Sequence, residues 1–257
     1  MMELLRRARS LLALLLTLAT FPIGTVPFYL VVVPLAWLRP AWRPALITAF
    51  MRGMSASILA MLSVGGARFR RRGALPTDGP ILIVANHQSL TDICQVVLLA
   101  RPFVPAFVTR SRYHRFIPLV SPCVRMIGSP IVDPAGNPRG AVDAVRRGAR
   151  ELQHGLLIFP EGHRTRNGEL RPFKTAGLRA ALEERRMPVY LVVSDGFWRA
   201  RRLVDFVFQV HLMNGESRVV GPIVAPEDDA GLEAFGASLR ERVAAELAGL
   251  RSASGSR

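Results

Sequence analysis

A histidine and an aspartate stand close together directly after an apolar run of the chain. Residues 86–92 have the sequence Asn-His-Gln-Ser-Leu-Thr-Asp and follow the apolar run 81–85. A histidine that is oriented by a carboxylate can act as a general base. Because residues five positions apart on a regular helix lie about 140° from each other, His87 must precede the helix and fold back onto Asp92. The segment therefore predicts a base and its orienting carboxylate where a strand ends.

The same segment also has the pattern of an ordinary helix start. Ser89 would then be the N-cap, and Asp92 would lie in the first turn, where the helix dipole favours a carboxylate. In that interpretation His87 is a loop histidine with no chemical role. The two interpretations are compatible, because a carboxylate that is fixed in a first helical turn is also well held to orient an imidazole.

A second polar cluster follows another apolar run about seventy residues later. Residues 159–165 have the sequence Phe-Pro-Glu-Gly-His-Arg-Thr and come directly after the run that begins at Leu156. Ligand sites in open α/β sheets lie outside the carboxyl ends of the strands. Two polar clusters, each just past a buried strand, therefore predict one site at that edge of a sheet.

In this order and spacing, the two motifs resemble the lysophosphatidic acid acyltransferase family, the glycerolipid acyltransferases. The resemblance rests on Asn-His followed by four residues and Asp, and then on Phe-Pro-Glu-Gly-x-Arg, and it covers roughly residues 75–224. It implies that His87 is the general base that takes the proton from an acceptor hydroxyl as this hydroxyl attacks an acyl thioester. Asp92 would orient the imidazole and stabilise its charged form, without a covalent acyl-enzyme.

The resemblance also implies a set of substrate-binding residues. Glu161, Gly162 and Arg164 match the second family motif, and Arg164 would hold an acceptor phosphate with two hydrogen bonds. Lys174, the only lysine of the chain, stands where the family also has lysine. The alternatives are a surface arginine at 164 and a helix-start or surface role for Lys174. No metal and no cofactor are expected, because the acyl-CoA or acyl-carrier protein is a substrate.

Two positions depart from the family pattern. His163 stands where the family usually has threonine, and it would either add a hydrogen-bond donor or point to solvent. Pro134 stands where the family usually has an arginine that binds the acceptor. Arg139, five residues further, is the nearest arginine that could replace it. The missing charge affects the identity of the acceptor more than it affects acyl transfer.

The chain is strongly basic, with a net charge of +15 and 50% hydrophobic residues. Three interpretations of the charge are a solvated surface, nucleic-acid binding and attraction to anionic lipids. The arginines are not interleaved with aromatic residues and no nucleic-acid motif is present, so no nucleic-acid partner is expected. Attraction to lipid headgroups and to phosphate-bearing substrates explains the charge together with the apolar N-terminus. Cys94 and Cys123 are expected to be reduced core thiols.

The N-terminus is apolar over a length that could cross a bilayer. Residues 10–38 contain no charged residue and have arginines on both sides, and about 20 apolar residues are enough to span. Because arginines flank both ends, the positive-inside rule does not choose an orientation, and a re-entrant hairpin is an alternative to a single span. Residues 54–67 are too short to span and indicate an interfacial or buried segment. The arginine-rich run 68–72 is expected to be a headgroup-level anchor or an exposed loop.

The remaining sequence alternates between strand-like and helix-like segments, which predicts an α/β fold with a mixed sheet flanked by helices, preceded by an N-terminal membrane-embedded helical segment. Asn214-Gly215 predicts a hairpin turn between strands near 206–211 and 218–220. The expected domains are a membrane-anchoring segment at 1–67, an acyltransferase domain at 68–250 and a disordered tail at 251–257. Expected strands lie near 81–85, 104–109, 129–132, 155–159 and 188–193, and expected helices near 90–100, 112–127, 138–153, 174–186 and 229–250.

These features predict a membrane-bound acyltransferase that moves a fatty acyl group to 1-acylglycerol 3-phosphate in phospholipid synthesis. Its partners would be a lysophospholipid acceptor, an acyl thioester donor and membrane lipids. It would lie at the inner, cytoplasmic membrane, with the catalytic domain facing the cytoplasm. Two alternatives stay open. One is a transferase of the same fold for another lysolipid or alcohol, such as a lyso-ornithine lipid, and the other is a non-catalytic basic protein that binds membrane surfaces.

Overall fold

The computed structural model describes residues 2–115, 117–200 and 202–255. Its centre is a six-stranded sheet in the order β1-β8-β7-β2-β6-β3, and β4 and β5 form a separate two-stranded sheet. Neighbouring strands of the large sheet are parallel except for β7 and β8, which are antiparallel. The strands are β1 (Arg68–Arg72), β2 (Ile81–Ala85), β3 (Ala106–Phe107), β4 (Thr109–Arg110), β5 (Ile131–Val132), β6 (Gly155–Ile158), β7 (Val189–Asp195) and β8 (Asn214–Ile223).

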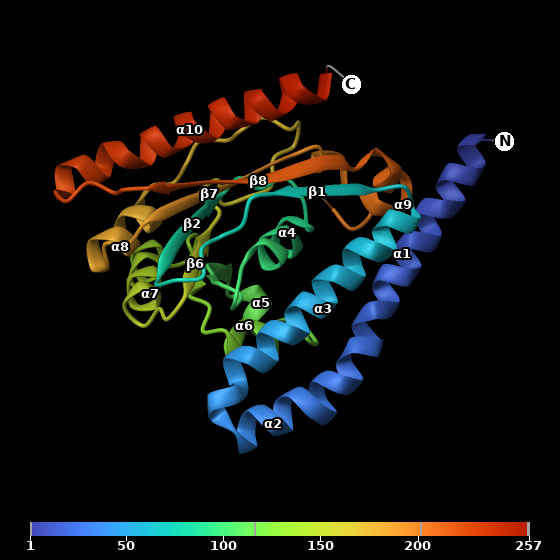
Figure 1. Cartoon of the computed structure of the whole chain (residues 1–257), viewed down its shortest axis with the longest axis horizontal. Coiled ribbons are helices and arrows are strands. Elements are labelled where there is room, and N and C mark those ends of the chain that lie inside the picture. The colour runs from blue at the N-terminus through green and yellow to red at the C-terminus, as the bar shows by residue number, and fades with distance from the viewer. Residues whose placement is uncertain (1, 116, 201, 256–257) are drawn as a thin grey trace.

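Helices cover both faces of this sheet (Figure 1). The helices are α1 (Met2–Pro27), α2 (Val33–Leu38), α3 (Arg43–Val64), α4 (Asp92–Leu99), α5 (Arg112–Arg115), α6 (Val120–Met126), α7 (Pro138–Arg150), α8 (Ala176–Glu184), α9 (Asp205–Gln209) and α10 (Asp229–Gly255). Shorter turns are η1 (Phe28–Val32), η2 (Pro40–Trp42), η3 (Trp198–Ala200) and η4 (Val210–Leu212). The fold class expected from the sequence, a mixed α/β sheet flanked by helices, is confirmed.

The side chains of β2 show why the sheet has a core on each side. All five residues of this strand are buried. Leu82 and Val84 pack with α7, α8 and α10 on one face, and Ile81 and Ile83 pack with α4 and α6 on the other. Because successive strand residues point to opposite faces, a continuous apolar run is what a strand covered on both sides requires.

The N-terminal helices form an antiparallel hairpin beside the sheet. Figure 1 shows α1 descending to α2 at the turn and α3 returning along it. Pro22 and Pro27 lie inside α1, and the π-helical η1 joins it to α2. Two stretches, Leu4–Leu38 and Pro40–Val64, are long and apolar enough to cross a membrane by length and composition. The expectation of a short separate segment at 54–67 was wrong in one respect, because residues 54–64 are the second half of a 22-residue helix that begins at Arg43.

Four other expectations differ from the structure. Residues 68–72 are not a loop but the edge strand β1, in which Arg70 and Arg72 form ion pairs with Glu216. The predicted hairpin around Asn214-Gly215 is wrong, because residues 205–212 are helical and Asn214 begins β8. The helix predicted near 112–127 is divided into α5 and α6. The expected tail 251–257 is helical through Gly255, since α10 continues past residue 250, and residues 256–257 lie outside the described part.

Candidate active site

His87 and Asp92 are in direct contact at the carboxyl end of β2. The Nδ1 atom of His87 lies 2.8 Å from Oδ2 of Asp92. The same oxygen accepts hydrogen bonds from the backbone N–H groups of Gln88, at 2.6 Å, and Ser89, at 2.9 Å. The Asp92 side chain is 2% exposed and that of His87 is 20% exposed. The expectation that His87 precedes the helix and folds back onto Asp92 is confirmed, whereas the N-cap of α4 is Thr91 and not Ser89.

The loop that carries His87 is bonded to the end of β7. Asn86 and Ser194 form a reciprocal pair, because the Asn86 amide donates to the Ser194 carbonyl and accepts from the Ser194 N–H, both at 2.8 Å. Gln88 donates to Asp195 and accepts from the N–H of Phe197. These bonds hold the backbone on either side of His87, so the ring has a defined position relative to the sheet.

Glu161 joins the two motifs through their backbones. One oxygen of its carboxylate accepts from the N–H of His87 at 2.7 Å, and the other accepts from the N–H of Arg171 at 2.9 Å. The Thr165 N–H also donates to the His87 carbonyl at 2.8 Å. Glu161 is 3% exposed, and burial raises its pKa, while the hydrogen bonds from Arg171 and His87 lower it in part. The structure therefore places this carboxylate between backbone segments.

The imidazole of His87 contacts Phe159 through its face and Asp92 through Nδ1. Its ring stacks on Phe159, with centroids 4.3 Å apart. Because Nδ1 is engaged with Asp92, Nε2 is the nitrogen that can take or give a proton. Asp92 fixes the tautomer in which Nδ1 carries hydrogen, which is the arrangement of a histidine base oriented by a carboxylate. This pair can therefore deprotonate a hydroxyl that is placed at Nε2.

Gly162 makes a turn in the second motif beside the side chain of Lys174. Its φ is +69°, a conformation that favours glycine, and its N–H donates to the Phe159 carbonyl at 3.0 Å. A Cβ atom placed on Gly162 would lie 3.7 Å from Nζ of Lys174. The Lys174 N–H in turn donates to the Pro160 carbonyl at 2.8 Å. The structure thus brings Lys174 next to Gly162 of the second motif.

Arg110 is a site residue that sequence reasoning missed. Its guanidinium donates to the Gly162 carbonyl at 3.1 Å and lies 2.8 Å from Nε2 of His163. Partial desolvation lowers the pKa of His163, followed by the charges of Arg110, Lys174, Arg171 and Arg112. His163 therefore marks a cluster of cations, which we call the cationic cluster, formed by Arg110, Arg112, Arg171 and Lys174. No local motif marks Arg110; its place follows from the pairing of β4 with β5, which sets it opposite Val132.

The two other predicted substrate-binding arginines, Arg164 and Arg139, lie in different parts of the structure. Arg164 is half-buried in the loop between β6 and α8, directly before the anchored Thr165. Arg139 is exposed on the first turn of α7, and within the described part of the chain no hydrogen bond or ion pair joins it to either motif. The structure therefore does not bring Arg139 to the site, whereas Arg110 contacts Gly162 and lies opposite Val132, two residues before Pro134.

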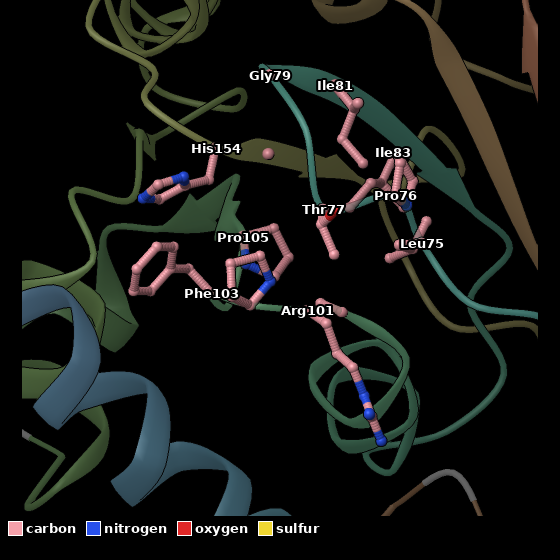
Figure 2. Close-up of a pocket in the computed structure, with 13 residues that line it drawn as sticks. Leu75, Pro76, Thr77, Gly79, Ile81, Ile83, Arg101, Phe103, Pro105 and His154 are labelled. Carbon is pink, nitrogen blue, oxygen red and sulfur yellow. The ribbon is translucent and has the colours of Figure 1, made fainter.

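A separate small pocket lies at the other end of β2. It is lined by the start of this strand at Ile81, by Phe103 and by His154 (Figure 2). The rings of Phe103 and His154 stack with centroids 4.2 Å apart, and burial lowers the pKa of His154. Because Ile81 begins β2 and His87 follows its end, this pocket is at the opposite edge of the sheet from the His87–Asp92 pair. His154 is a packed histidine in this setting.

Comparison with known proteins shows what this chain resembles in sequence. Three plant proteins are similar over part of it: 1-acyl-sn-glycerol-3-phosphate acyltransferase LPAT1, chloroplastic, of Arabidopsis thaliana, 32% identical over 41% of this chain; the BAT2 enzyme of the same name from Brassica napus, 32% identical over 38%; and a 1-acyl-sn-glycerol-3-phosphate acyltransferase of Cocos nucifera, 29% identical over 48%. The matches span 29%, 28% and 40% of these relatives' own lengths.

The fold is also that of a solved structure. The 1-acyl-sn-glycerophosphate acyltransferase PlsC from Thermotoga maritima superposes with a TM-score of 0.73 over 94% of this chain and 97% of that chain, at 19% sequence identity. The sequence profile of the family named Acyltransferase matches residues 67–194, a range that contains both motifs. The chain therefore belongs to the acyltransferase family that includes the lysophosphatidic acid acyltransferases.

Proposed function

We propose that this protein transfers a fatty acyl group from an acyl thioester to the free hydroxyl of a lysophospholipid, with 1-acylglycerol 3-phosphate as the acceptor. The observation that carries the proposal is the contact between His87 and Asp92 at the sheet edge where the cationic cluster also lies. A base beside several cations suits a hydroxyl substrate that carries a phosphate. The donor would be acyl-CoA or acyl-carrier protein, and no resident cofactor or metal is required.

The proposed reaction uses His87 twice. Nε2 takes the proton of the acceptor hydroxyl as its oxygen attacks the thioester carbonyl. The tetrahedral intermediate then collapses, the carbon–sulfur bond breaks, and the imidazolium returns the proton to the leaving thiolate. The products are an ester and a free thiol, so atoms and charges balance without an acyl-enzyme. Asp92 stabilises the imidazolium between the two proton transfers.

The phosphate of the acceptor would bind to the cationic cluster together with Arg164. Arg110, opposite Val132 and in contact with Gly162, would supply the charge that the family usually has at the position of Pro134, so the site would be rebuilt from β4 and not from Arg139. Glu161 would act as a positioning residue, because both of its oxygens already accept backbone hydrogen bonds. Gly162 would keep the turn open for Lys174.

Membrane association would come from the N-terminal hairpin. α3 packs on α4 and α6, and α1 packs on α3, so one side of the hairpin faces the α/β part of the chain. Large apolar side chains are exposed along α1, η1 and α2, among them Leu4, Leu30 and Trp37, which are 73%, 73% and 80% exposed. Embedding of this outward face at the cytoplasmic side of the inner membrane would remove them from water.

A matrix of donors and acceptors tests the proposal. Purified protein is incubated with labelled acyl-CoA or acyl-carrier protein and with 1-acylglycerol 3-phosphate, a lysophospholipid without a terminal phosphate, a lyso-ornithine lipid or a long-chain alcohol. We expect transfer to be fastest with 1-acylglycerol 3-phosphate. Faster transfer to a phosphate-free acceptor would favour the alternative that Pro134 suggests, and absence of transfer from either donor to any acceptor would favour a non-catalytic membrane-binding protein.

A further inference from the structure

The segment of residues 202–212, which contains α9 and η4, presents an apolar surface to solvent. Leu203, Val204, Phe208 and Leu212 are 53%, 58%, 52% and 39% exposed. Val204, Phe208 and Leu212 are spaced four residues apart, so they form one stripe along the helical turns. Four large apolar side chains so close together on a surface indicate an interaction site and not random exposure.

The opposite side of this segment is fixed to the N-terminal hairpin. Phe206 and Val210 are 4% and 0% exposed and pack in one cluster with Ala13 and Leu14 of α1 and Leu62 of α3. A Cβ placed on Gly65, at the end of α3, would come within 2.6 Å of Val210 and 2.8 Å of Ala13. The 202–212 segment is therefore held rigidly against the hairpin by close packing.

The part of α1 that neighbours the segment also carries exposed apolar side chains. The turns of α1 that pack against Phe206 and Val210 also carry four exposed leucines. These are Leu11, Leu12, Leu15 and Leu18, which are 45%, 49%, 55% and 40% exposed. Figure 1 shows α9 beside the first half of α1, at the end of the hairpin where β1 begins. Exposed apolar side chains therefore occur on both of two elements that pack against each other.

Positive charge and a tryptophan border the segment on its N-terminal side. Arg199 and Arg202 are exposed, and the Arg199 guanidinium lies over the ring of Trp198, 5.2 Å from its centroid. Exposed arginines next to apolar side chains fit a bilayer that carries anionic headgroups, and tryptophan is enriched at the headgroup level. The charges therefore favour a lipid surface over an apolar protein partner.

The η3 turn, which precedes the segment and packs against α9, is hydrogen-bonded with Phe197 to the loop that carries the base. Ser89 Oγ donates to the Ala200 carbonyl at 2.7 Å, and the Phe197 N–H donates to Gln88 Oε1 at 3.1 Å. Ser89 and Gln88 also donate their backbone N–H groups to Asp92. The segment is therefore linked to the His87–Asp92 pair indirectly, through the packing of α9 on η3 and the hydrogen bonds of Ala200 and Phe197 to the His87 loop.

We propose that the 202–212 segment is a second membrane contact, which inserts Leu203, Val204, Phe208 and Leu212 into an anionic bilayer surface and holds the His87 loop at the level of the headgroups. This inference rests on the membrane association proposed above for the hairpin and extends it to an element at the far end of the sequence. Its consequence is that a lysolipid enters the site from the bilayer without crossing water.

Site-specific fluorescence quenching tests the proposal in the full-length protein. Single cysteines at Phe208→Cys, Leu30→Cys and Val224→Cys carry an environment-sensitive fluorophore. Val224 is the matched control, because it is apolar and 84% exposed. It follows the end of β8, whereas the 202–212 segment precedes the beginning of that strand, so the ten residues of β8 separate the two positions. The native thiols interfere little, since burial raises the pKa of Cys94 to about 11 and of Cys123 to about 12.

The labelled proteins are bound to vesicles of phosphatidylglycerol and phosphatidylcholine with a quencher on the acyl chain. We expect quenching at positions 208 and 30 but not at 224. Quenching at 30 without quenching at 208 overturns the inference and leaves the hairpin as the membrane contact. Absence of quenching at all three positions overturns the membrane association itself. A fluorophore at 208 that is shielded from water but insensitive to the lipid quencher indicates a protein partner, which also overturns the inference.

A kinetic measurement keeps the proposal testable if the label disturbs the segment. The double variant V204S/F208S should raise the apparent KM for 1-acylglycerol 3-phosphate presented in vesicles by about tenfold, equivalent to about 1.4 kcal/mol. The KM for a short-chain acceptor that is monomeric in solution should not change, and Val224→Ser should change neither constant. An equal loss with both substrates would show that the segment has only a structural role.

Discussion

Asp92 receives three hydrogen bonds on one carboxylate oxygen. Oδ2 binds His87 Nδ1 and the backbone N–H groups of Gln88 and Ser89. A carboxylate bound to two backbone amides is fixed in place, so it orients the imidazole and is not itself the group that receives the substrate proton. At the scale of single residues, the site is therefore one histidine whose geometry is set by a buried carboxylate.

Asp92→Asn should lower kcat strongly and also destabilise the fold. The amide has no negative charge for the imidazolium, and we expect a loss of about 10²–10⁴-fold in kcat. Hydrogen bonds to charged groups contribute about 1.5–3 kcal/mol each, so the free energy of unfolding should also fall. Steady-state kinetics and urea unfolding measure the two effects. Asp133→Asn, at an exposed position, is the control, and an Asp92→Asn protein with wild-type kcat would contradict the assigned role.

Arg110 and Arg164 should control acceptor binding. Arg110→Ala and Arg164→Ala should each raise the KM for 1-acylglycerol 3-phosphate by about ten- to hundredfold, since a charged hydrogen bond contributes roughly 1.5–3 kcal/mol. The KM for the thioester should change less. Arg139→Ala serves as the matched exposed arginine and should leave both constants unchanged. If instead Arg139→Ala has the large effect and Arg110→Ala has none, the phosphate site is built from α7.

The pKa of His163 should report on the cationic cluster. Partial desolvation and the neighbouring cations lower this pKa, so the imidazole stays neutral to a lower pH than a free histidine. Arg110→Ala removes one of the cations, and the pKa of His163 should rise, though not fully, because the desolvation stays. NMR titration of its ring protons measures the shift, with Arg139→Ala as the control. A His163 pKa that falls or does not move on loss of Arg110 would contradict the proposed cluster.

At the scale of elements, the site depends on loops that are tied together after β2, β6 and β7. Glu161 is the main tie, because it joins the His87 loop to residue 171. Glu161→Gln keeps the size of the side chain but replaces one acceptor oxygen with an amide donor, so one backbone N–H loses its partner. We expect a loss of about 1–3 kcal/mol in the free energy of unfolding together with reduced kcat.

Urea unfolding and kinetics of the Glu161→Gln protein check this expectation. Glu169→Gln is the control, because Glu169 is an exposed carboxylate of the same loop that pairs with Arg251. If Glu161→Gln raised only the acceptor KM and left stability unchanged, Glu161 would bind the substrate and would not act as a positioning residue.

The elements that the sequence predicted well are those with an unambiguous apolar pattern. β2 and β7 are buried runs, and their position and type were predicted correctly. The helical segment 205–212 was predicted as a strand because Phe206, Val207 and Phe208 are consecutive apolar residues. In the structure Phe206 is buried against the hairpin while Phe208 is exposed, and the packing partner on α1 lies almost two hundred residues away in the sequence. Local pattern alone cannot contain that information.

In the site, too, the local contact was predicted from the sequence and the long-range contacts were not. The His87–Asp92 contact follows from five-residue spacing before a helix, and it was predicted correctly. Arg110 was missed, because its place beside Gly162 depends on the two-stranded sheet of β4 and β5. Arg139 was chosen for its nearness in sequence to Pro134, but α7 carries it to an exposed position. Closeness along the chain was therefore a poor guide to closeness in space.

At the scale of the whole molecule, a basic chain of net charge +15 carries a long apolar hairpin along one side. Charge attraction alone would be screened at high salt, where the Debye length is about 3 Å at 1 M, whereas burial of apolar surface would not be. We therefore expect the intact protein to stay on anionic vesicles at 1 M salt and to need detergent for release. Sedimentation with vesicles measures this, and full release by salt alone would show that the hairpin does not insert.

The measurement that tests the central claim most directly compares acyl transfer by wild-type protein and by His87→Ala. Both are purified in detergent and assayed with labelled acyl-CoA or acyl-carrier protein and 1-acylglycerol 3-phosphate, with His154→Ala as a histidine control from the opposite edge of the sheet. We predict labelled diacyl product with the wild-type and His154→Ala proteins, and a rate about 10²–10⁴-fold lower with a folded His87→Ala protein. A rate near that of the wild type in folded His87→Ala would contradict the account.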